Sequence, residues 1–440
     1  MVLFKDERNV CASKKVSKVI KPENIEEKIV WFSIVGTYIY YPLGALYFIG
    51  PICGYVLLFI LVIRWFKQVQ QSKIPNSEKI QIPVVTWIWV VGMLIELLAL
   101  VMGHMDWELG LSQLVKSTFG WAKGWALLAI FPLAGSLKIR PCLIYRAVSI
   151  LCVQTLIIAP FLVAFSFLKI NINYVSILNK LGGAGDIFFQ VQLYDLHEQE
   201  GEIRFPFFTP WSPALGLLGN IYFPLVFKER NLRLRAIGII TCILICYLSK
   251  SRMALMCLPL VVLSLLGIQK ILNPIFLVIS GIGALVLGVV GTFVEKNVSM
   301  AWEEIRSSRA ASTRVRDALQ NIALERFRDA PIWGHGIVET GPKIVEHMPI
   351  GSHHTIISLL YIKGIVGLLG FLLPLIISFE YLLVNLRFNP LSQLGITILL
   401  ILTFYSFGEN LEVLAYLFWP GLILLGMAFK RQTSITNSWI

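Results

Sequence analysis

The sequence has few charged residues and no cysteine framework. Charged side chains make up 15% of the 440 residues, whereas a soluble domain carries about 25%. The 7 cysteines lie mostly in or beside apolar runs, without the spacing of a disulfide scaffold or a zinc site. These shortages exclude an ordinary cytosolic enzyme and a disulfide-stapled secreted module. A disordered chain is excluded because 56% of the residues are apolar.

What the sequence does contain is a series of long apolar runs. Runs near 20 residues match the thickness of a bilayer core, and about twelve can be traced. They cover 29–46, 48–64, 82–103, 119–137, 143–168, 207–227, 235–249, 253–268, 272–294, 354–385, 391–407 and 411–429. The pattern predicts an all-α fold, a polytopic integral membrane helical bundle of about 12 transmembrane helices.

The placement of charge gives each connection a side. A net charge of +12 would suggest nucleic acid binding in a soluble protein, but in a membrane protein Lys and Arg mark cytoplasmic loops. With the N-terminal tail inside, alternate connections are cationic, and most of the others are acidic or mixed. We therefore expect both ends in the cytoplasm and no nucleic acid partner.

The same assignment divides the chain into five parts. We expect, in order, a cytoplasmic tail, a bundle of about nine helices, one long outer loop with short helices, about three further helices and a second cytoplasmic tail. These parts are 1–28, 29–294, 295–352, 353–429 and 430–440.

Cations and histidines gather on the predicted outer side. They are Arg204, Lys250, Arg252, Arg314, Arg316 and the pair His353-His354. Arginine binds a diphosphate through bidentate hydrogen bonds, and histidine can take a proton from a hydroxyl near neutral pH. These residue types suit the transfer of a sugar from a lipid diphosphate to a hydroxyl, with no cofactor and no metal. Glu96, inside an apolar run, is a second functional candidate because acids within membrane spans are rare.

Several of these residues lie in motifs that resemble a known family. The pair His353-His354, then nine residues, then Gly364-Ile365-Val366-Gly367 is similar to the signature of bacterial O-antigen ligases and polymerases. His354 departs from it, since the family usually has Asn, Ser or Gln there. Three further segments resemble elements of the family: RDALQNIALERFRDAPIWGHG from Arg316, LSKSRMALM around Arg252, and RFPFFTPWSPALG from Arg204.

The resemblance implies a fold, an activity and roles for these residues. It implies a helical bundle in the bacterial cytoplasmic (inner) membrane, with a periplasmic loop and an active site facing the periplasm. The implied activity is transfer of an undecaprenyl-diphosphate-linked glycan to a hydroxyl of another glycan or of a lipopolysaccharide core, among membrane lipids. By the same resemblance, His353, Arg316 and Arg204 would be catalytic. The residues implied to bind substrate are Arg252, Arg314, His354 and Lys250.

Several alternatives stay open at this point. The chain could be a transporter or flippase for polysaccharide or lipid-linked sugar, and an enzyme could be either a ligase or a polymerase. Either His353 or His354 could be the base, and His353 could instead cap the following helix. Arg316 could lie on a solvated helix face, and Arg252 could reach lipid head groups.

Overall fold

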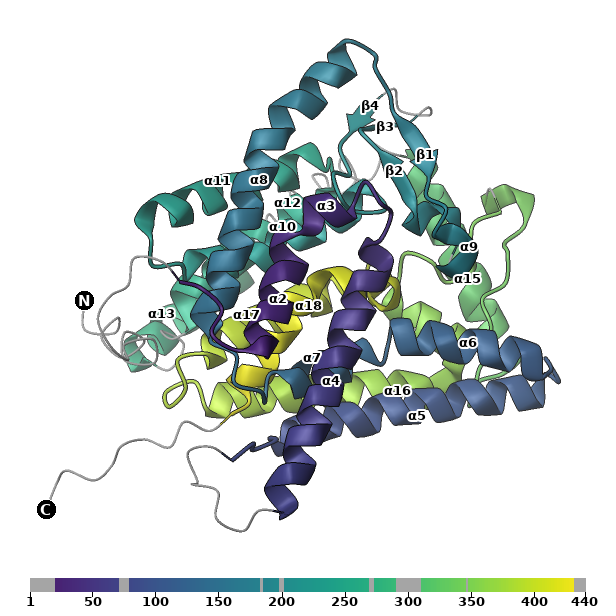
Figure 1. The fold of residues 1–440 in the computed structure, drawn as a ribbon. Helices are drawn as coiled ribbons and strands as arrows, with labels where there is room; N and C mark the ends of the chain where they lie inside the picture. The colour runs from purple at the N-terminus through teal and green to yellow at the C-terminus, as the bar shows by residue number, and fades with distance from the viewer. Residues whose placement is uncertain are drawn as a thin grey trace, which may run out of the picture.

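Helices dominate the computed structural model of the chain (Figure 1). The structure describes residues 20–70, 79–182, 185–197, 202–268, 273–289, 310–345 and 347–430. The helices are α2 (Ile25–Val35), α3 (Thr37–Tyr40), α4 (Leu46–Gln70), α5 (Val84–Asp106), α6 (Leu111–Lys123), α7 (Leu127–Ala134), α8 (Pro141–Phe167), α9 (Asn179–Gly182), α10 (Ser212–Phe227), α11 (Leu232–Leu248), α12 (Arg252–Gly267), α13 (Pro274–Val289), α15 (Ala310–Phe327), α16 (Thr355–Val384), α17 (Ser392–Ser406) and α18 (Leu411–Ala428).

Among the described helices, five are long and apolar enough to cross a membrane, namely α4, α5, α8, α16 and α18. Four more apolar helices, α10, α12, α13 and α17, have 15 or 16 residues each. The expected number of about twelve spans is therefore not confirmed. The single span expected at 119–137 is wrong, because residues 124–126 separate α6 from α7.

The expectation of a purely helical fold also needs a correction. The connection from α8 to α10 contains four short strands, β1 (Asn173–Val175), β2 (Gln190–Gln192), β3 (Asp195–His197) and β4 (Glu202–Arg204). β1 pairs with β2 and β3 with β4, both antiparallel, with Tyr174 opposite Val191 and Asp195 opposite Arg204. This connection is thus a second structured region between helices, besides the described part of the expected loop at 295–352, of which residues 295–309 and 346 lie outside the described residues.

The bundle has two distinct ends. At one end, which we call the terminal end, the side chains of Asn24 and Lys430 contact the main-chain carbonyls of Lys138 and Leu137. Figure 1 shows α8 running from this end to the region of β1–β4 and α9, with α15 nearby. We call that opposite end the α15 end.

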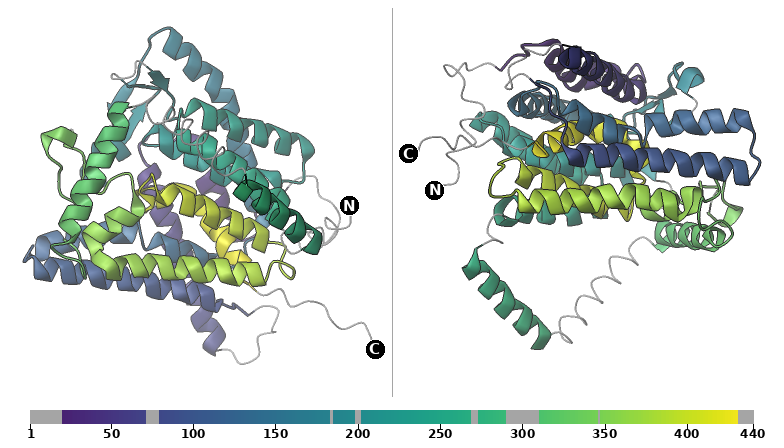
Figure 2. Two further views of the ribbon diagram at one scale, coloured as in Figure 1. Left: turned by 180° about the vertical axis from the view of Figure 1, so that it is seen from behind. Right: turned by 90° about the horizontal axis from the view of Figure 1, so that it is seen from below.

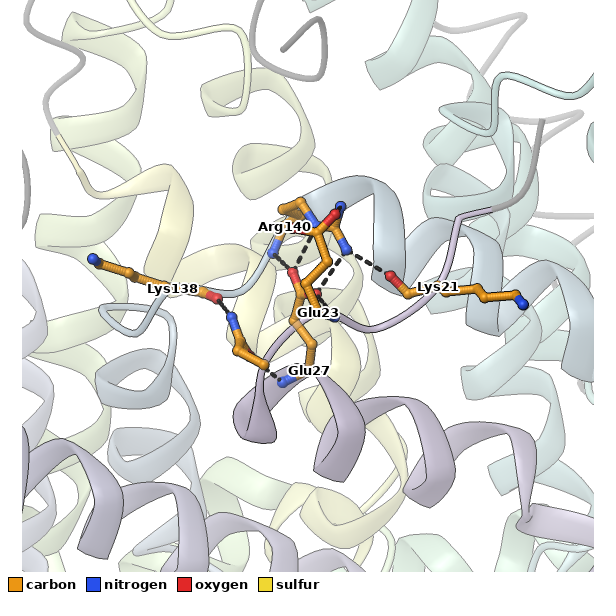
Figure 3. Close-up of polar contacts among 6 residues, drawn as sticks. Lys21, Glu23, Glu27, Lys138 and Arg140 are labelled. Carbon is orange, nitrogen blue, oxygen red and sulfur yellow. Dashed lines mark hydrogen bonds and ion pairs between the residues drawn. The ribbon is translucent and has the colours of Figure 1, made fainter. Parts of the chain in front are cut away.

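Ion pairs with buried carboxylates stabilise the terminal end (Figure 3). Arg140 donates to both oxygens of Glu27 at 2.8 and 2.7 Å and contacts Glu23 at 2.5 Å. Two similar pairs are Arg64–Glu26 at 2.6 Å and Arg146–Glu229 at 2.8 Å. In each pair the arginine lies next to a connection that the charge pattern predicts to be cytoplasmic.

Replacing Arg140 with alanine should destabilise the terminal end. Glu27 is 1% exposed and would keep its charge without this partner, which should cost about 2 kcal/mol of the free energy of unfolding. The measurement is thermal unfolding of the purified protein in detergent. Lys138→Ala is the matched control because Lys138 contacts Asn24 only through its main-chain carbonyl. Equal melting temperatures for the two variants would contradict the expectation.

Helices α5 and α16 pack closely against each other, and Figure 2 (right) shows them side by side. At their crossing, a Cβ on Gly92 would lie 2.3 Å from the carbonyl oxygen of Gly370, and the reverse distance is 2.7 Å. Only glycine permits this approach, and small residues are the usual means of close helix packing in membranes. The crossing fixes α16, which begins at the candidate site.

Candidate functional site

The connection between α17 and α18 is the centre of the candidate site at the α15 end. Glu409 in this connection is 2% exposed and accepts a hydrogen bond from Nε1 of Trp211 at 3.1 Å. The hydroxyl of Thr355 donates to the main-chain oxygen of Glu409 at 2.6 Å and accepts from the amide of Leu411 at 3.0 Å. Thr355 is the first residue of α16, so these bonds hold the start of α16 against the main chain of the connection that carries Glu409.

The two adjacent histidines have different environments. His354 is the N-cap of α16: its Nδ1 accepts from the amide of Ile357 at 3.3 Å, and its ring packs edge-on against Phe407 at 5.8 Å. The alternative that His353 caps this helix is therefore wrong. His353 has a φ of +68°, a left-handed conformation that is uncommon for residues other than glycine. The imidazole of His354 is thus engaged in its own helix, which makes His353 the better candidate for a base.

Arg316 on α15 lies within electrostatic range of both His353 and Glu409. Burial and the charge of Arg316 together lower the pKa of His353 to about 4. Burial raises the pKa of Glu409, whereas Arg316 and the hydrogen bond from Trp211 oppose the rise. At neutral pH the imidazole of His353 is therefore uncharged and able to accept a proton. Both residues belong to the set His353, Arg316 and Arg204 that the resemblance to the ligases implies to be catalytic.

The turn between α11 and α12 brings further cations beside the same connection. Ser251 caps α12 by accepting from the amide of Ala254 at 3.3 Å, which places Arg252 in the first turn of that helix. The next residue, Met253, lies so close to Gly408 that a Cβ there would be 2.0 Å from its sulfur. Lys250, in the turn itself, has its Nζ over the ring of Tyr247 at 5.5 Å.

β4 adjoins this turn. Arg204 is the last residue of β4 and is partly buried, and the amide of the next residue, Phe205, bonds to the carbonyl of Leu248 at 3.4 Å. Arg314 differs from the other predicted cations, because it is exposed and two positions from Arg316, so the two do not share a face of α15.

Sequence reasoning missed Glu409 and Trp211. Glu409 lies in the short connection Gly408-Glu409-Asn410 between two apolar runs, and an acid held between two spans is a usable signal. Trp211 carried no signal, because its partner is 198 positions away in the chain.

The Gly-x-x-Gly part of the motif has a structural explanation. Gly364 has φ +61° and ψ −165°, which interrupts α16, and a Cβ there would lie 2.2 Å from the carbonyl oxygen of Ile332. The segment 331–336, which follows α15, takes up backbone groups near the break. The amides of His335 and Gly336 bond to the carbonyls of Tyr361 and Ile362 at 2.9 and 2.8 Å, and the amides of Ile365 and Val366 bond to those of Pro331 and Ile332 at 2.9 and 3.3 Å. The segment Gly334-His335-Gly336 therefore packs against the backbone of α16 next to the Gly-x-x-Gly motif.

Glu96 has a partner that the sequence did not reveal. Nζ of Lys363, the residue before the break, lies 2.9 Å from Oε2 of Glu96, and the two side chains are 2% and 0% exposed. The same ammonium lies 4.6 Å from the ring centroid of Trp125. The buried ion pair thus joins α5 to α16 at the last residue of the half of α16 that follows His353.

Comparison with models of known protein families gives a match. Residues 237–372 match the family model Wzy_C, described as O-antigen ligase. The matched segment includes Arg252, Arg316 and His353, whereas Arg204 and Glu409 lie outside it. No curated protein matches the chain in a sequence search. The resemblance drawn from the motifs is confirmed over this segment: residues 237–372 are similar to the O-antigen ligase family.

Proposed function

We propose that this protein transfers a polyprenyl-diphosphate-linked glycan to an acceptor hydroxyl at the α15 end, which faces the periplasm of a bacterial inner membrane. The observation that carries the proposal is that His353 is partly buried and lies within electrostatic range of Arg316 on α15. An uncharged imidazole beside a fixed guanidinium provides a base next to an anion-binding group. The match to the O-antigen ligase family supports the same chemistry.

The proposed step uses this chain's residues without a cofactor. His353 accepts the proton of the acceptor hydroxyl while the hydroxyl oxygen bonds to the first carbon of the donor sugar. The bond from that carbon to the diphosphate oxygen breaks, and the polyprenyl diphosphate leaves with the electron pair. Arg316 and Arg204 stabilise the charge on the leaving diphosphate, and Arg252 and Lys250 hold it from the α11–α12 turn. His354 holds the start of α16 in place.

Transfer by the purified protein tests this proposal directly. The reaction would contain detergent-solubilised protein, an undecaprenyl-diphosphate-linked glycan and an acceptor, either lipopolysaccharide core or a second lipid-linked glycan. A new glycosidic product, with release of undecaprenyl diphosphate, is the expected result. Absence of product with both acceptors, from protein that is folded and monodisperse, would reject the proposal. Which acceptor reacts distinguishes a ligase from a polymerase.

Two substitutions of Arg316 should separate the effect of its charge on the reaction from the effect of its bidentate guanidinium group. Arg316→Lys keeps the charge but loses the bidentate fork, so kcat should fall about a hundredfold while the acidic limb of the pH profile stays in place. Arg316→Gln also removes the charge that disfavours protonation of His353, so the pKa of His353 should rise from about 4 toward 6.5. The acidic limb of kcat should then move to higher pH. An unchanged rate and KM in both variants would show that Arg316 does not hold the diphosphate.

The lowered pKa of His353 has a matching effect on stability. Because the unfolded chain binds this proton more readily than the folded one, the contribution of His353 to stability is complete above pH 6.5. It is lost as the pH falls toward about 4.

A second candidate function is transport of the lipid-linked sugar. The observation in its favour is the interrupted α16 with the buried pair Lys363–Glu96, since broken helices and buried ionisable groups mark transport paths. Product formed in detergent, where no gradient exists, excludes a purely transporting protein. Uptake of lipid-linked sugar into proteoliposomes without acceptor would favour transport.

A further inference from the structure

The half of α16 before its break is held at both ends. Residues 355–363 form this half-helix, which is preceded by His353 and ends at Lys363. At its start, the hydroxyl of Thr355 bonds to the main-chain oxygen of Glu409 at 2.6 Å. At its end, Nζ of Lys363 bonds to Glu96 at 2.9 Å. A short helix fixed at both ends has little freedom to rotate or slide.

Lys363 is well placed to hold the C-terminal end of the half-helix. The last carbonyls of a helix carry partial negative charge, so a cation at the last position of the half-helix is favourable. Its ammonium is enclosed by the carboxylate of Glu96 and the ring of Trp125, which come from α5 and from the α6–α7 connection. Nζ of Lys363 on α16 therefore contacts both α5 and the α6–α7 connection.

The same break also fixes the position of Arg316. The segment 331–336 bonds to the backbone on both sides of Gly364, and it follows α15, which carries Arg316, after only a short turn. α15, which carries Arg316, and the half-helix 355–363, which follows His353, are thus both attached to the backbone around Gly364. A shift of the half-helix along its axis would move His353 relative to Arg316.

We infer that the buried pair Lys363–Glu96 positions His353 for the reaction. The pair does so by fixing where the half-helix 355–363 lies along its axis and how it is rotated about that axis. Lys363 and Glu96 act as positioning residues, since both are buried at the opposite end of the half-helix from His353. Buried ion pairs usually add little stability compared with apolar residues of similar size, so a role in geometry explains the pair better than a role in stability. The inference rests on the proposed function only for its kinetic consequence, and the geometric consequence can be measured separately.

The test replaces the pair with apolar residues of similar volume, Lys363→Met with Glu96→Leu. The melting temperature should stay close to that of the unmodified protein, because no unpaired charge remains. We expect kcat to fall at least about tenfold with KM within about twofold, since misplacement of a catalytic group acts on the chemical step. The control is Arg146→Met with Glu229→Leu, which removes a buried ion pair at the terminal end and should leave kcat unchanged.

A second readout does not depend on transfer. The rate at which diethyl pyrocarbonate modifies His353, followed by mass spectrometry as a function of pH, reports its protonation. In the double variant the midpoint should move from about 4 toward 6.5, because the imidazole leaves its buried place beside Arg316. If the unmodified protein catalyses no transfer, the proposed function fails, whereas a shifted midpoint still supports the positioning role.

Glu96→Asp covers the case in which the double variant fails to insert. It keeps both charges but withdraws the carboxylate by one methylene group, so Lys363 must follow it or lose the bond. We expect a severalfold lower kcat, and Lys363→Arg, which keeps a cation at the position, should retain more activity than the apolar pair. An unaltered kcat and an unaltered His353 midpoint in either Glu96→Asp or the double variant would overturn the inference.

Discussion

Replacing His353 with alanine should abolish glycan transfer while the protein still inserts and folds. A positioned base contributes about a hundredfold to ten-thousandfold to a rate, and in the proposed mechanism no other residue takes the hydroxyl proton. The fold should tolerate the change because the imidazole caps no helix, whereas that of His354 does. The measurement is kcat of the purified variant beside its melting temperature and its yield in the membrane.

His347→Ala is the matched control for this variant. His347 also has a left-handed backbone, with a φ of +58° against +68° for His353, but its side chain is exposed. Any effect of placing alanine at positive φ should therefore be common to both variants, and only the loss of His353 should stop transfer. Normal transfer by His353→Ala, or equal losses in the two, would contradict the assignment of the base.

Gly364→Ala should have the largest effect on folding. A φ of +61° with a ψ of −165° is reached almost only by glycine, which should cost alanine up to about 3 kcal/mol. The added Cβ would also lie 2.2 Å from the carbonyl oxygen of Ile332, a main-chain atom that cannot move without breaking the bonds of segment 331–336. We expect little folded protein in the membrane, as measured by size-exclusion chromatography of the detergent extract.

Gly120→Ala is the control for an added methyl group. Gly120 lies inside α6, where a Cβ would meet nothing within 4 Å, and alanine favours a helix over glycine by about 1 kcal/mol. This variant should be as stable as the unmodified protein or more so. A Gly364→Ala protein that is recovered folded in normal amounts would show that α16 can continue without its break.

Apolar runs predicted most helix positions but not the interruptions within them. The run at 143–168 corresponds to α8 at 141–167, because apolar residues continue through the whole helix there. The run at 119–137 contains a break at 124–126, where a Cβ on Gly124 would lie 2.6 Å from Cγ of Glu412. That contact comes from α18, so the local sequence could not indicate it.

The candidate site was predicted in part for the same reason. The residues that follow from local motifs, His353, Arg316 and Arg252, lie near one another or on adjoining segments. The partners that complete the arrangement are distant in the chain: Glu409 lies 198 positions from Trp211, and Lys363 lies 267 from Glu96. Pairing over such separations depends on the tertiary fold, and no periodicity within one helix encodes it.

The interruption at Gly364 also sets the depth of the site in a bilayer. The 20 residues from 365 to 384 rise about 30 Å as a helix, which equals the thickness of the hydrocarbon core. If this half of α16 crosses the core, the preceding half-helix adds a further rise of about 13 Å and carries His353 into the layer of the lipid phosphates. The acceptor hydroxyl would then meet the donor at the membrane surface, and a polyprenyl tail could remain among the acyl chains throughout the reaction.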